Sequence, residues 1–553
     1  MLVDTRRLEE GKVIETGVCV IGGGAAGITV ALELEKQGID AVVLESGGFR
    51  PDEPTRDLYR GENVGLPYEF ADGCRRRFLG GSSNCWGGWC RPLDEADFLK
   101  RDWIPYSGWP FGKSELAPYY ERTHDVLKLG PLNYDAAYWE SAIGRRDVRR
   151  VPLTTGAVVD RISQFSPPMR FGKYYRSELK RAAKVRVLLY ANATEIETNK
   201  SANSVTQVRV RTLSGRTVWV SARLFVLAAG GIENARLLLA SNSTQAAGLG
   251  NGNDVVGRYY MDHPRLLHSK ITLRDQWRGN RLYDIKHHYQ NRAIAAHGTK
   301  IACQFALTEE TQRKEQISNS RIWLCSIFSD KDTQVAQALI KIKRGLTGET
   351  QDNFSWAREM GTLVGNPGET TRFLAERFLR PRFLMTNVKF QAIVEPVPDP
   401  DSRVTLAAER DALGMNRVRV NWKMGEIEKR TFDRGFQYVA EELQRNGVAD
   451  VTMEAPVMDR EWSALLGELP YPSGTWHHMG STRMHDSPKL GVVDRNCQVH
   501  GVSNLYIAGS SVFPTCGANF PTITLVALAL RLSDRIAQVL RDGDQLSIAR
   551  QVA

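Results

Sequence analysis

A cluster of glycines near the start of the chain has the spacing of a phosphate-binding turn. Gly22, Gly24 and Gly27 stand where a strand would turn sharply, approach a pyrophosphate and pass into a closely packed helix. The N–H groups at the start of such a helix attract phosphate charge. Glu45 lies about 20 residues further on, where an acidic side chain accepts hydrogen bonds from a ribose hydroxyl. These residues predict dinucleotide binding and do not distinguish FAD from NAD.

The segments around this motif predict the elements that would position it. Apolar runs at residues 18–21 and 41–44 predict strands, and residues 25–37 between them predict a helix. The order of strand, glycine and helix recurs at residues 224–241 and again at residues 504–540. Recurring units of this kind build a doubly wound sheet. We therefore expect an α/β domain of Rossmann type, assembled from separated segments of the chain.

A second glycine-rich segment begins at Gly80 and contains Trp86 and Trp89. Its density of glycine and tryptophan argues against a regular helix or a central strand. Glycines permit close approach of the backbone, and tryptophans offer large flat surfaces. We expect a second contact surface for a flat, phosphate-bearing cofactor, with a loop held by aromatic packing as the alternative.

Two neighbouring histidines, His477 and His478, could take part in proton transfer. A neutral imidazole near its ordinary pKa can accept a proton at neutral pH. The structural alternative is a histidine packed beside Trp476 that donates to a backbone carbonyl. The residues alone leave both interpretations open.

Residues 264–474 differ in their pattern of apolar residues from the segments on either side. They alternate short apolar runs with amphipathic helical patterns, which predicts an α+β domain built on an antiparallel sheet. The expected strands are residues 268–273, 388–394, 404–406 and 417–422, and the expected helices are residues 332–344, 370–383 and 426–444. We expect this segment to be inserted into the dinucleotide-binding domain as a separate substrate-binding domain.

Length and composition narrow the class of protein. At 553 residues, 42% hydrophobic and 25% charged, the chain can form two or more globular domains. It shows no secretory signal and no apolar run long enough for a membrane span, so we expect a cytoplasmic protein. The net charge of +10 arises from bases scattered among 63 acids, which favours a solvated surface over a nucleic-acid site. Eight cysteines without zinc-like pairs indicate neither a metal site nor a disulfide framework.

In order and spacing, these motifs resemble the glucose–methanol–choline (GMC) oxidoreductases, FAD-dependent enzymes that oxidise alcohols. The resemblance covers nearly the whole chain and looks nearest to the sugar-oxidising branch that includes pyranose oxidases. It implies FAD as the cofactor, an FAD-binding domain over residues 12–263 and 475–545, and a substrate-binding domain over residues 264–474. Loops between residues 92 and 184 are expected on the substrate side. The resemblance rests on residues 22–27 with Glu45, 80–83, 228–233, 256–258, 261–264 and 477–531.

The resemblance also implies which residues form the site. In the family, a histidine in an H-x-x-G frame faces the flavin, which selects His477 over His478. Its implied role is to accept the proton of a substrate hydroxyl while hydride passes from the same carbon to flavin N5. The residues implied to contact FAD are Gly22, Gly24, Gly27, Glu45, Gly80, Gly81, Ser82, Asn84, Cys85, Ala229, Gly509, Ser510, Pro521 and Thr522.

Two positions depart from the family pattern. Family members place a histidine or asparagine directly before the Pro-Thr that opens the last helix, but here Phe520 precedes Pro521. A phenyl ring cannot orient a hydroxyl, so we expect Asn519 to serve as the second catalytic group after a shift of one residue. At the position of Cys85, related enzymes carry a histidine bonded covalently to the flavin. A thioether from Cys85 is chemically possible, and a flavin held without a covalent bond is the alternative.

We therefore predict an enzyme that uses FAD to oxidise an alcohol, a sugar or polyol hydroxyl, to a carbonyl. The expected partners are a small-molecule alcohol and an electron acceptor that the sequence leaves open: oxygen, a quinone or a redox protein. A lyase of the hydroxynitrile type, which keeps FAD without net redox chemistry, is the alternative that Phe520 favours. A nucleotide-binding scaffold without chemistry is a third interpretation, against which His477 and Asn519 argue.

Overall fold

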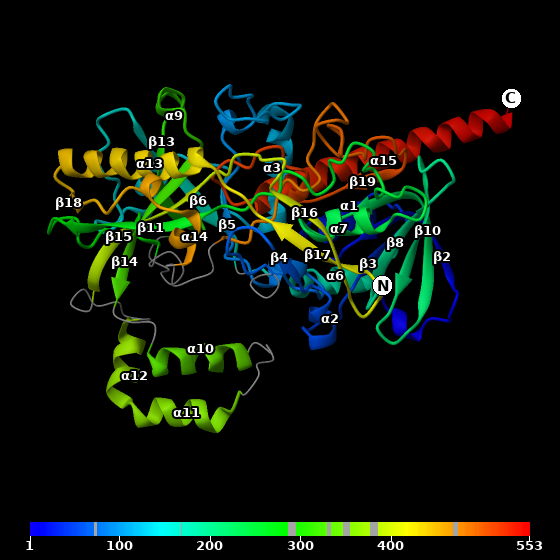
Figure 1. The fold of residues 1–553 in the computed structure, drawn as a ribbon, viewed down its shortest axis with the longest axis horizontal. Coiled ribbons are helices and arrows are strands. Elements are labelled where there is room, and N and C mark those ends of the chain that lie inside the picture. Colours follow the sequence, from blue (N-terminus) through cyan, green and yellow to red (C-terminus); the bar gives the residue numbers. More distant parts are fainter. Residues whose placement is uncertain are drawn as a thin grey trace.

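The computed structural model describes residues 1–70, 75–167, 169–285, 295–328, 333–346, 354–376, 385–467 and 474–552. These residues form two large sheets and one small one, with the amino terminus beside the first large sheet (Figure 1). Within the described ranges, no helix combines the length and the apolar character that crossing a membrane requires.

The first large sheet is mostly parallel and carries helices of the predicted strand–turn–helix units. In sheet order its strands are β1 (Leu2–Asp4), β7 (Val185–Leu189), β3 (Ala41–Glu45), β2 (Val13–Ile21), β10 (Thr217–Leu227), β9 (Val205–Arg211) and β8 (Asn192–Thr198), with β19 (Leu505–Ile507) also paired to β10. Only the β10–β9 and β9–β8 pairs are antiparallel. The pairing of β19 with β10 brings the carboxyl-terminal segment into the sheet that the amino-terminal segment begins.

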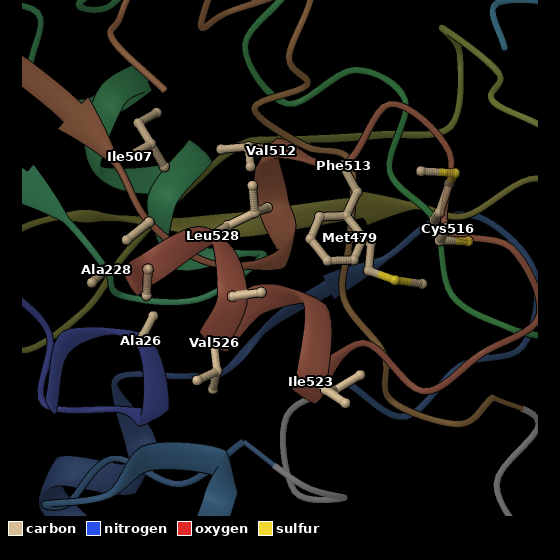
Figure 2. Close-up of a cluster of buried hydrophobic side chains, with 14 of the residues drawn as sticks. Ala26, Ala228, Met479, Ile507, Val512, Phe513, Cys516, Ile523, Val526 and Leu528 are labelled. Carbon is tan, nitrogen blue, oxygen red and sulfur yellow. The ribbon is translucent and has the colours of Figure 1, made fainter. Parts of the chain in front are cut away.

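Helices from both ends of the chain share one hydrophobic core. Helix α1 (Ala25–Lys36) and helix α3 (Lys113–Leu127) pack against α15 (Thr522–Val552). Figure 2 shows side chains from these distant segments in one cluster, among them Ala26, Ala228, Ile507, Val526 and Leu528. Because these side chains are apolar and fully buried, they stabilise the contact between the two ends of the chain.

The predicted apolar strand that begins at residue 224 is the second half of a longer strand. Strand β10 runs without a break from residue 217 to residue 227. Its first half pairs with β9 in the antiparallel hairpin, and it pairs with β2 in parallel along nearly its whole length. The polar residues Ser221 and Arg223 do not interrupt it because ladder pairing to β2 continues past them.

The second large sheet is antiparallel, as predicted for the inserted segment. In sheet order its strands are β18 (Ala449–Thr452), β11 (Arg265–Leu273), β15 (Met385–Val394), β14 (Ser320–Phe328), β13 (Thr299–Leu307), β6 (Val158–Phe165) and β5 (Trp89–Cys90), with β12 (Ala295–Ala296) paired to β13. Helix α13 (Glu426–Arg445), predicted at residues 426–444, lies along this sheet (Figure 1). Strands β5 and β6 reach this sheet from the amino-terminal part of the chain; β5 lies in the glycine-rich segment and β6 within residues 92–184, where substrate-side loops were expected.

Two predicted strands of the inserted segment lie outside the second sheet. Strands β16 (Arg403–Arg410) and β17 (Asn416–Asn421) form a hairpin that pairs with β4 (Gly61–Asn63) in the small third sheet. The hairpin packs against α7 (Glu233–Ala240), which follows β10 of the first sheet, and the valines of its two strands are buried.

Three helices project from the second sheet between β14 and β15 (Figure 1): α10 (Gln334–Leu346), α11 (Trp356–Gly365) and α12 (Pro367–Leu374). Helix α10 corresponds to the helix predicted at 332–344, whose residue 332 lies outside the described residues. Helix α12 covers only the start of the helix predicted at 370–383, and residues 377–383 also lie outside them. The other helices are α2 (Glu53–Asp57), α4 (Ala136–Ile143), α5 (Phe171–Tyr174), α6 (Arg176–Arg181), α9 (Glu309–Glu315) and α14 (Trp462–Gly467).

Candidate active site

Residues from both ends of the chain line a single cavity of about 500 Å³. Its wall combines the turn after β2, the end of β3, the glycine-rich loop, the segment after β10, the loop that carries the two histidines and the start of α15. The predicted site residues among them are Gly22, Gly24, Glu45, Gly81, Ser82, Cys85, Ala229, His477, Gly509, Ser510, Pro521 and Thr522. The cavity has the size of a site for a cofactor or another small molecule.

The turn after β2 has the geometry that its glycines predicted. Gly22 has a left-handed φ of 115°, and a Cβ there would overlap the backbone of Ala228. A Cβ on Gly27 would overlap the carbonyl oxygen of Gly22, so only glycine allows α1 to pack this closely. Gly24 precedes α1 and has no side chain to cap it, which leaves the first N–H groups of the helix for an anionic ligand.

Glu45 ends β3 and turns its buried carboxylate towards the same turn. Its Oε2 accepts a hydrogen bond from the Gly23 N–H at 3.2 Å, and its Oε1 accepts one from the Gly47 N–H at 2.8 Å. Burial raises the pKa of Glu45, and these N–H groups oppose that rise. The side chain lines the cavity and retains lone pairs for a further donor.

Some residues of the glycine-rich loop line the cavity, whereas others hold the loop in shape and do not line it. The Gly80 N–H donates to the Gly23 carbonyl at 2.8 Å, and the Asn84 amide donates to the carbonyls of Leu79 and Gly81. Gly80, Asn84 and likewise Gly27 are not among the described residues that line the cavity. These three predicted cofactor contacts thus lie behind the wall, where they hold its backbone in place.

Asp262 holds the loop that carries the two histidines. Its Oδ1 accepts hydrogen bonds from the His477 N–H and the Thr475 hydroxyl, both at 2.8 Å. Its Oδ2 accepts from the Trp476 N–H at 2.9 Å and from the Tyr68 hydroxyl at 2.7 Å. These bonds maintain the left-handed φ of 59° at Trp476. The loop is therefore fixed by one fully buried carboxylate.

The ring of His477 is held on one side only. Its Nδ1 lies 2.9 Å from Thr475 Oγ1 and 2.9 Å from His263 Nδ1. Its Nε2 has no hydrogen-bond partner in the described part of the chain. Burial, followed by the nearby His263, His478 and Arg265, lowers the pKa of His477 well below its ordinary value. The imidazole is therefore neutral at neutral pH, with one nitrogen available at the cavity.

Phe520, not Asn519, lies against His477. The phenyl ring packs edge-on to the imidazole with centroids 5.3 Å apart and stacks on Trp89. Asn519 is fully buried and does not line the cavity formed by the described residues. Its Oδ1 accepts from Arg321 Nε at 3.0 Å, and its Nδ2 donates to the Pro92 carbonyl at 2.9 Å. The expected shift of one residue is wrong as geometry, because both ends of the amide are used elsewhere.

His478 also lines the cavity, in a different environment. Its ring packs between Tyr68 and Tyr260, and burial lowers the pKa of His478 to about 3. Its Nε2 is buried and has no hydrogen-bond partner among the described residues. An unpaired buried nitrogen costs free energy. The uncapped start of α1 and the glycine turns fit a polar cofactor such as FAD.

His263 and Arg265 are among the site residues that were not predicted. His263 lies within the predicted motif at residues 261–264, but its contact with His477 joins residues 214 positions apart, which no local pattern indicates. Arg265 begins β11 and lines the cavity. Its place two residues after His263 in the chain was the available signal.

Known proteins match this chain along most of its length. The family model for FAD-dependent oxidoreductases matches residues 17–247, and the model for GMC oxidoreductases matches residues 398–529. A formate oxidase structure from Aspergillus oryzae shares the fold, with a TM-score of 0.56 at 17% identity over 97% of this chain and 100% of that one.

Three curated relatives extend the comparison. The 2-methyl-1,2-propanediol dehydrogenase of Mycolicibacterium austroafricanum is 24% identical over 96% of each chain. The paromamine 6'-oxidase of Streptomyces fradiae is 23% identical over 94% of this chain and 91% of that one. The fructose dehydrogenase large subunit of Gluconobacter japonicus is 26% identical over 59% of this chain, and the match spans about half (49%) of that protein. With both family models on the site segments just described, the chain belongs to the GMC oxidoreductases and is an FAD-dependent enzyme.

Proposed function

We propose that this enzyme oxidises an alcohol to a carbonyl compound and that its substrate is a sugar or polyol. The observation that carries the proposal is His477, a neutral imidazole whose unpartnered Nε2 stands at the cavity beside the predicted cofactor turns. The names of the relatives support the substrate class, since they describe enzymes of a sugar, a diol and an amino sugar.

His477 acts as the general base. When bound, FAD supplies the acceptor for the hydride that leaves the carbinol carbon. Nε2 of His477 accepts the proton of the substrate hydroxyl, so that a carbonyl rather than an alkoxide is released. Asp262 and Thr475 hold the loop and the ring in position for this transfer. Phe520 packs against the imidazole and excludes water from that side of the ring.

The remaining predicted residues hold the cofactor in this proposal. Gly22, Gly24 and the start of α1 would bind the pyrophosphate, and Glu45 would accept a hydrogen bond from a ribose hydroxyl. The wall residues of the glycine-rich loop, the segment after β10 and the start of α15 contact the rest of FAD. The FAD-binding domain spans residues 12–263 and 475–545, apart from β5 and β6, which join residues 264–474 in the substrate-binding domain.

The anaerobic spectrum of the purified holoenzyme tests the proposal. A sugar or polyol substrate should bleach the flavin absorbance, and His477→Ala should retain FAD but lower the bleaching rate by about 10²- to 10⁴-fold, the contribution of a general base. His297→Asn is the matched control, because His297 lies on the surface beside Tyr138. Bleaching at the wild-type rate in His477→Ala would remove the histidine from the mechanism. Reoxidation by oxygen, a quinone or a redox protein then identifies the acceptor.

Phe520 favours a second candidate function, a non-redox lyase of the hydroxynitrile type. An apolar ring stands where a hydrogen-bonding group would assist hydride transfer from an alcohol. Cleavage of a hydroxynitrile by the holoenzyme, without bleaching by any alcohol, would establish the lyase and exclude the oxidation.

The thiol of Cys85 lines the cavity with its Sγ 3.2 Å from the Ser82 carbonyl. We propose that FAD is held without a covalent bond. Acid precipitation should then leave a colourless pellet and a yellow supernatant. A yellow pellet that becomes colourless in Cys85→Ala would show a thioether instead.

A further inference from the structure

His263 is fully buried and lies beside His477, the proposed general base. It follows Met261, which bridges to Met479 beside the histidine loop, and it precedes β11. Its Nε2 lies 2.8 Å from the Gly517 carbonyl and its Nδ1 lies 2.9 Å from Nδ1 of His477. The two rings meet edge to face, with an interplanar angle of 87°. Both ring nitrogens of His263 are thus engaged.

These contacts determine which nitrogen carries each proton. A carbonyl oxygen can only accept, so Nε2 of His263 carries the hydrogen. Burial lowers the pKa of His263 to about 4, so the neutral ring has a bare Nδ1. The 2.9 Å contact between the two Nδ1 atoms then requires the hydrogen on His477, whose Nε2 is left with its lone pair.

Thr475 fits the same tautomer. Its hydroxyl hydrogen points to Asp262 Oδ1 at 2.8 Å. Its oxygen therefore accepts the contact at 2.9 Å from Nδ1 of His477. A hydroxyl can also turn and donate to a bare Nδ1, whereas the bare Nδ1 of His263 can only accept, so it is His263 that excludes the other tautomer.

We propose that His263 is a positioning residue that fixes the tautomer of His477 and keeps its Nε2 lone pair available at the cavity. The proposal deepens the proposed function, in which His477 is the base. The hydroxyl proton goes to Nε2, the Nδ1 hydrogen stays in place, and the resulting imidazolium already has two acceptors for it. The reaction therefore requires no transfer of a proton from His477 to His263.

The anchor behind His263 is rigid. The Gly517 N–H donates to Glu395, which forms a buried two-point ion pair with Arg101 at 2.7 Å. Gly517 has a left-handed φ of 53°, and a Cβ there would overlap the Asp97 carboxylate. The carbonyl that orients His263 therefore cannot turn away without breaking this buried ion-paired structure.

Two substitutions each keep one of the two hydrogen bonds of the His263 ring and remove the other. His263→Asn places a carbonyl oxygen near the position of Nδ1 and keeps an acceptor for His477. His263→Gln places its amide nitrogen near the position of Nε2 and keeps the donor to Gly517, without that acceptor. We expect His263→Gln to slow anaerobic flavin reduction by roughly 10- to 100-fold and His263→Asn to slow it by less than about 5-fold, part of what a general base contributes.

Nuclear magnetic resonance of ¹⁵N-histidine-labelled holoenzyme reads the tautomer without turnover. The chain has ten histidines, and His477→Ala assigns the signals of interest. Wild type and His263→Asn should show His477 with a protonated Nδ1 and a bare Nε2, whereas His263→Gln should show a mixture of tautomers. FAD content and thermal unfolding confirm that each variant is folded.

A wild-type His477 with its hydrogen on Nε2 would overturn the proposal, as would equal reduction rates in the Asn and Gln variants. If His263→Gln does not fold, the tautomer of His477 in wild type and the tautomer and reduction rate in His263→Asn still test the proposal. A failure of the proposed function is distinguishable, because His477→Ala would then reduce at the wild-type rate whatever tautomer the spectra show.

Discussion

The turn at residues 22–27 and the loop at residues 474–480 line the same cavity but are built differently. In the turn, backbone groups form most of the wall and no side chain is larger than a methyl group, so glycine is the residue that matters. In the loop, side chains form the wall, and Asp262 and His263 from a distant segment hold them in place. The cofactor side thus depends on local backbone geometry, whereas the base side depends on long-range hydrogen bonds.

The two regions should respond differently to mutation. Replacing a glycine of the turn should weaken cofactor binding and lower the free energy of unfolding together, because it disturbs the packing of strand against helix. A changed residue at the histidine loop should leave FAD bound and alter proton transfer, because the first sheet is untouched. His477→Ala, described above, is the reference variant for the loop.

Gly27→Ala should have the largest effect on the turn. The new Cβ overlaps the Gly22 carbonyl, so we expect a loss of about 1–3 kcal/mol in the free energy of unfolding and purified protein with little FAD. Gly361→Ala is the control, because a Cβ on Gly361 in α11 meets open space. Absorbance at the flavin band and thermal unfolding measure both effects. Full FAD content in Gly27→Ala at wild-type stability would contradict the backbone account.

Asp262→Asn should separate the two sides of the cavity. An amide nitrogen would replace one carboxylate oxygen and face donors rather than acceptors, which we expect to cost about 1–3 kcal/mol of stability. Flavin reduction should slow with the displaced His477, while the FAD content stays at the wild-type level. Asp401→Asn, at an exposed carboxylate, is the matched control. Loss of FAD from Asp262→Asn alone would show that the loop also supports the cofactor.

Asn519→Ala should lower the free energy of unfolding and leave the rate of flavin reduction largely unchanged. Removing the amide leaves Arg321 Nε and the Pro92 carbonyl without their partner, a loss of about 1–3 kcal/mol in the free energy of unfolding. The rate of flavin reduction at saturating substrate should change far less than in His477→Ala. A rate as low as that of His477→Ala, with unchanged stability, would restore Asn519 as a catalytic group.

At neutral pH the smallest effect is expected from His478, because its contribution to stability appears only as the pH falls. Burial, with a smaller contribution from Arg75, lowers the pKa of His478 to about 3 in the folded protein, against about 6.5 when unfolded. The unfolded chain therefore binds the extra proton below pH 6.5, and wild type loses stability as the pH falls. Relative to His478→Gln, wild type should lose about 1.4 kcal/mol per pH unit between pH 6 and about pH 4. Denaturant unfolding of both proteins measures the difference, and parallel pH profiles would show that His478 titrates normally.

Much of the fold followed from periodicity and turn residues. The strand, turn and helix around Gly22, the antiparallel sheet and helix α13 are confirmed. The extension of the predicted strand at residue 224 back to residue 217 in β10, and the place of β16 and β17 beside α7, were missed, because strand partners are chosen by packing between distant segments.

By itself, the sequence determined the cofactor turn and the type of cofactor enzyme, since a glycine turn needs only neighbouring residues to specify its backbone. The tertiary structure decided which side chains meet at His477. The sequence left open whether residue 519 or residue 520 faces the cavity, and the stacking of Phe520 on Trp89 and the hydrogen bond of Asn519 with Arg321 decide it. The partner of the base, His263, lies 214 positions away, and only folding brings it within hydrogen-bond distance.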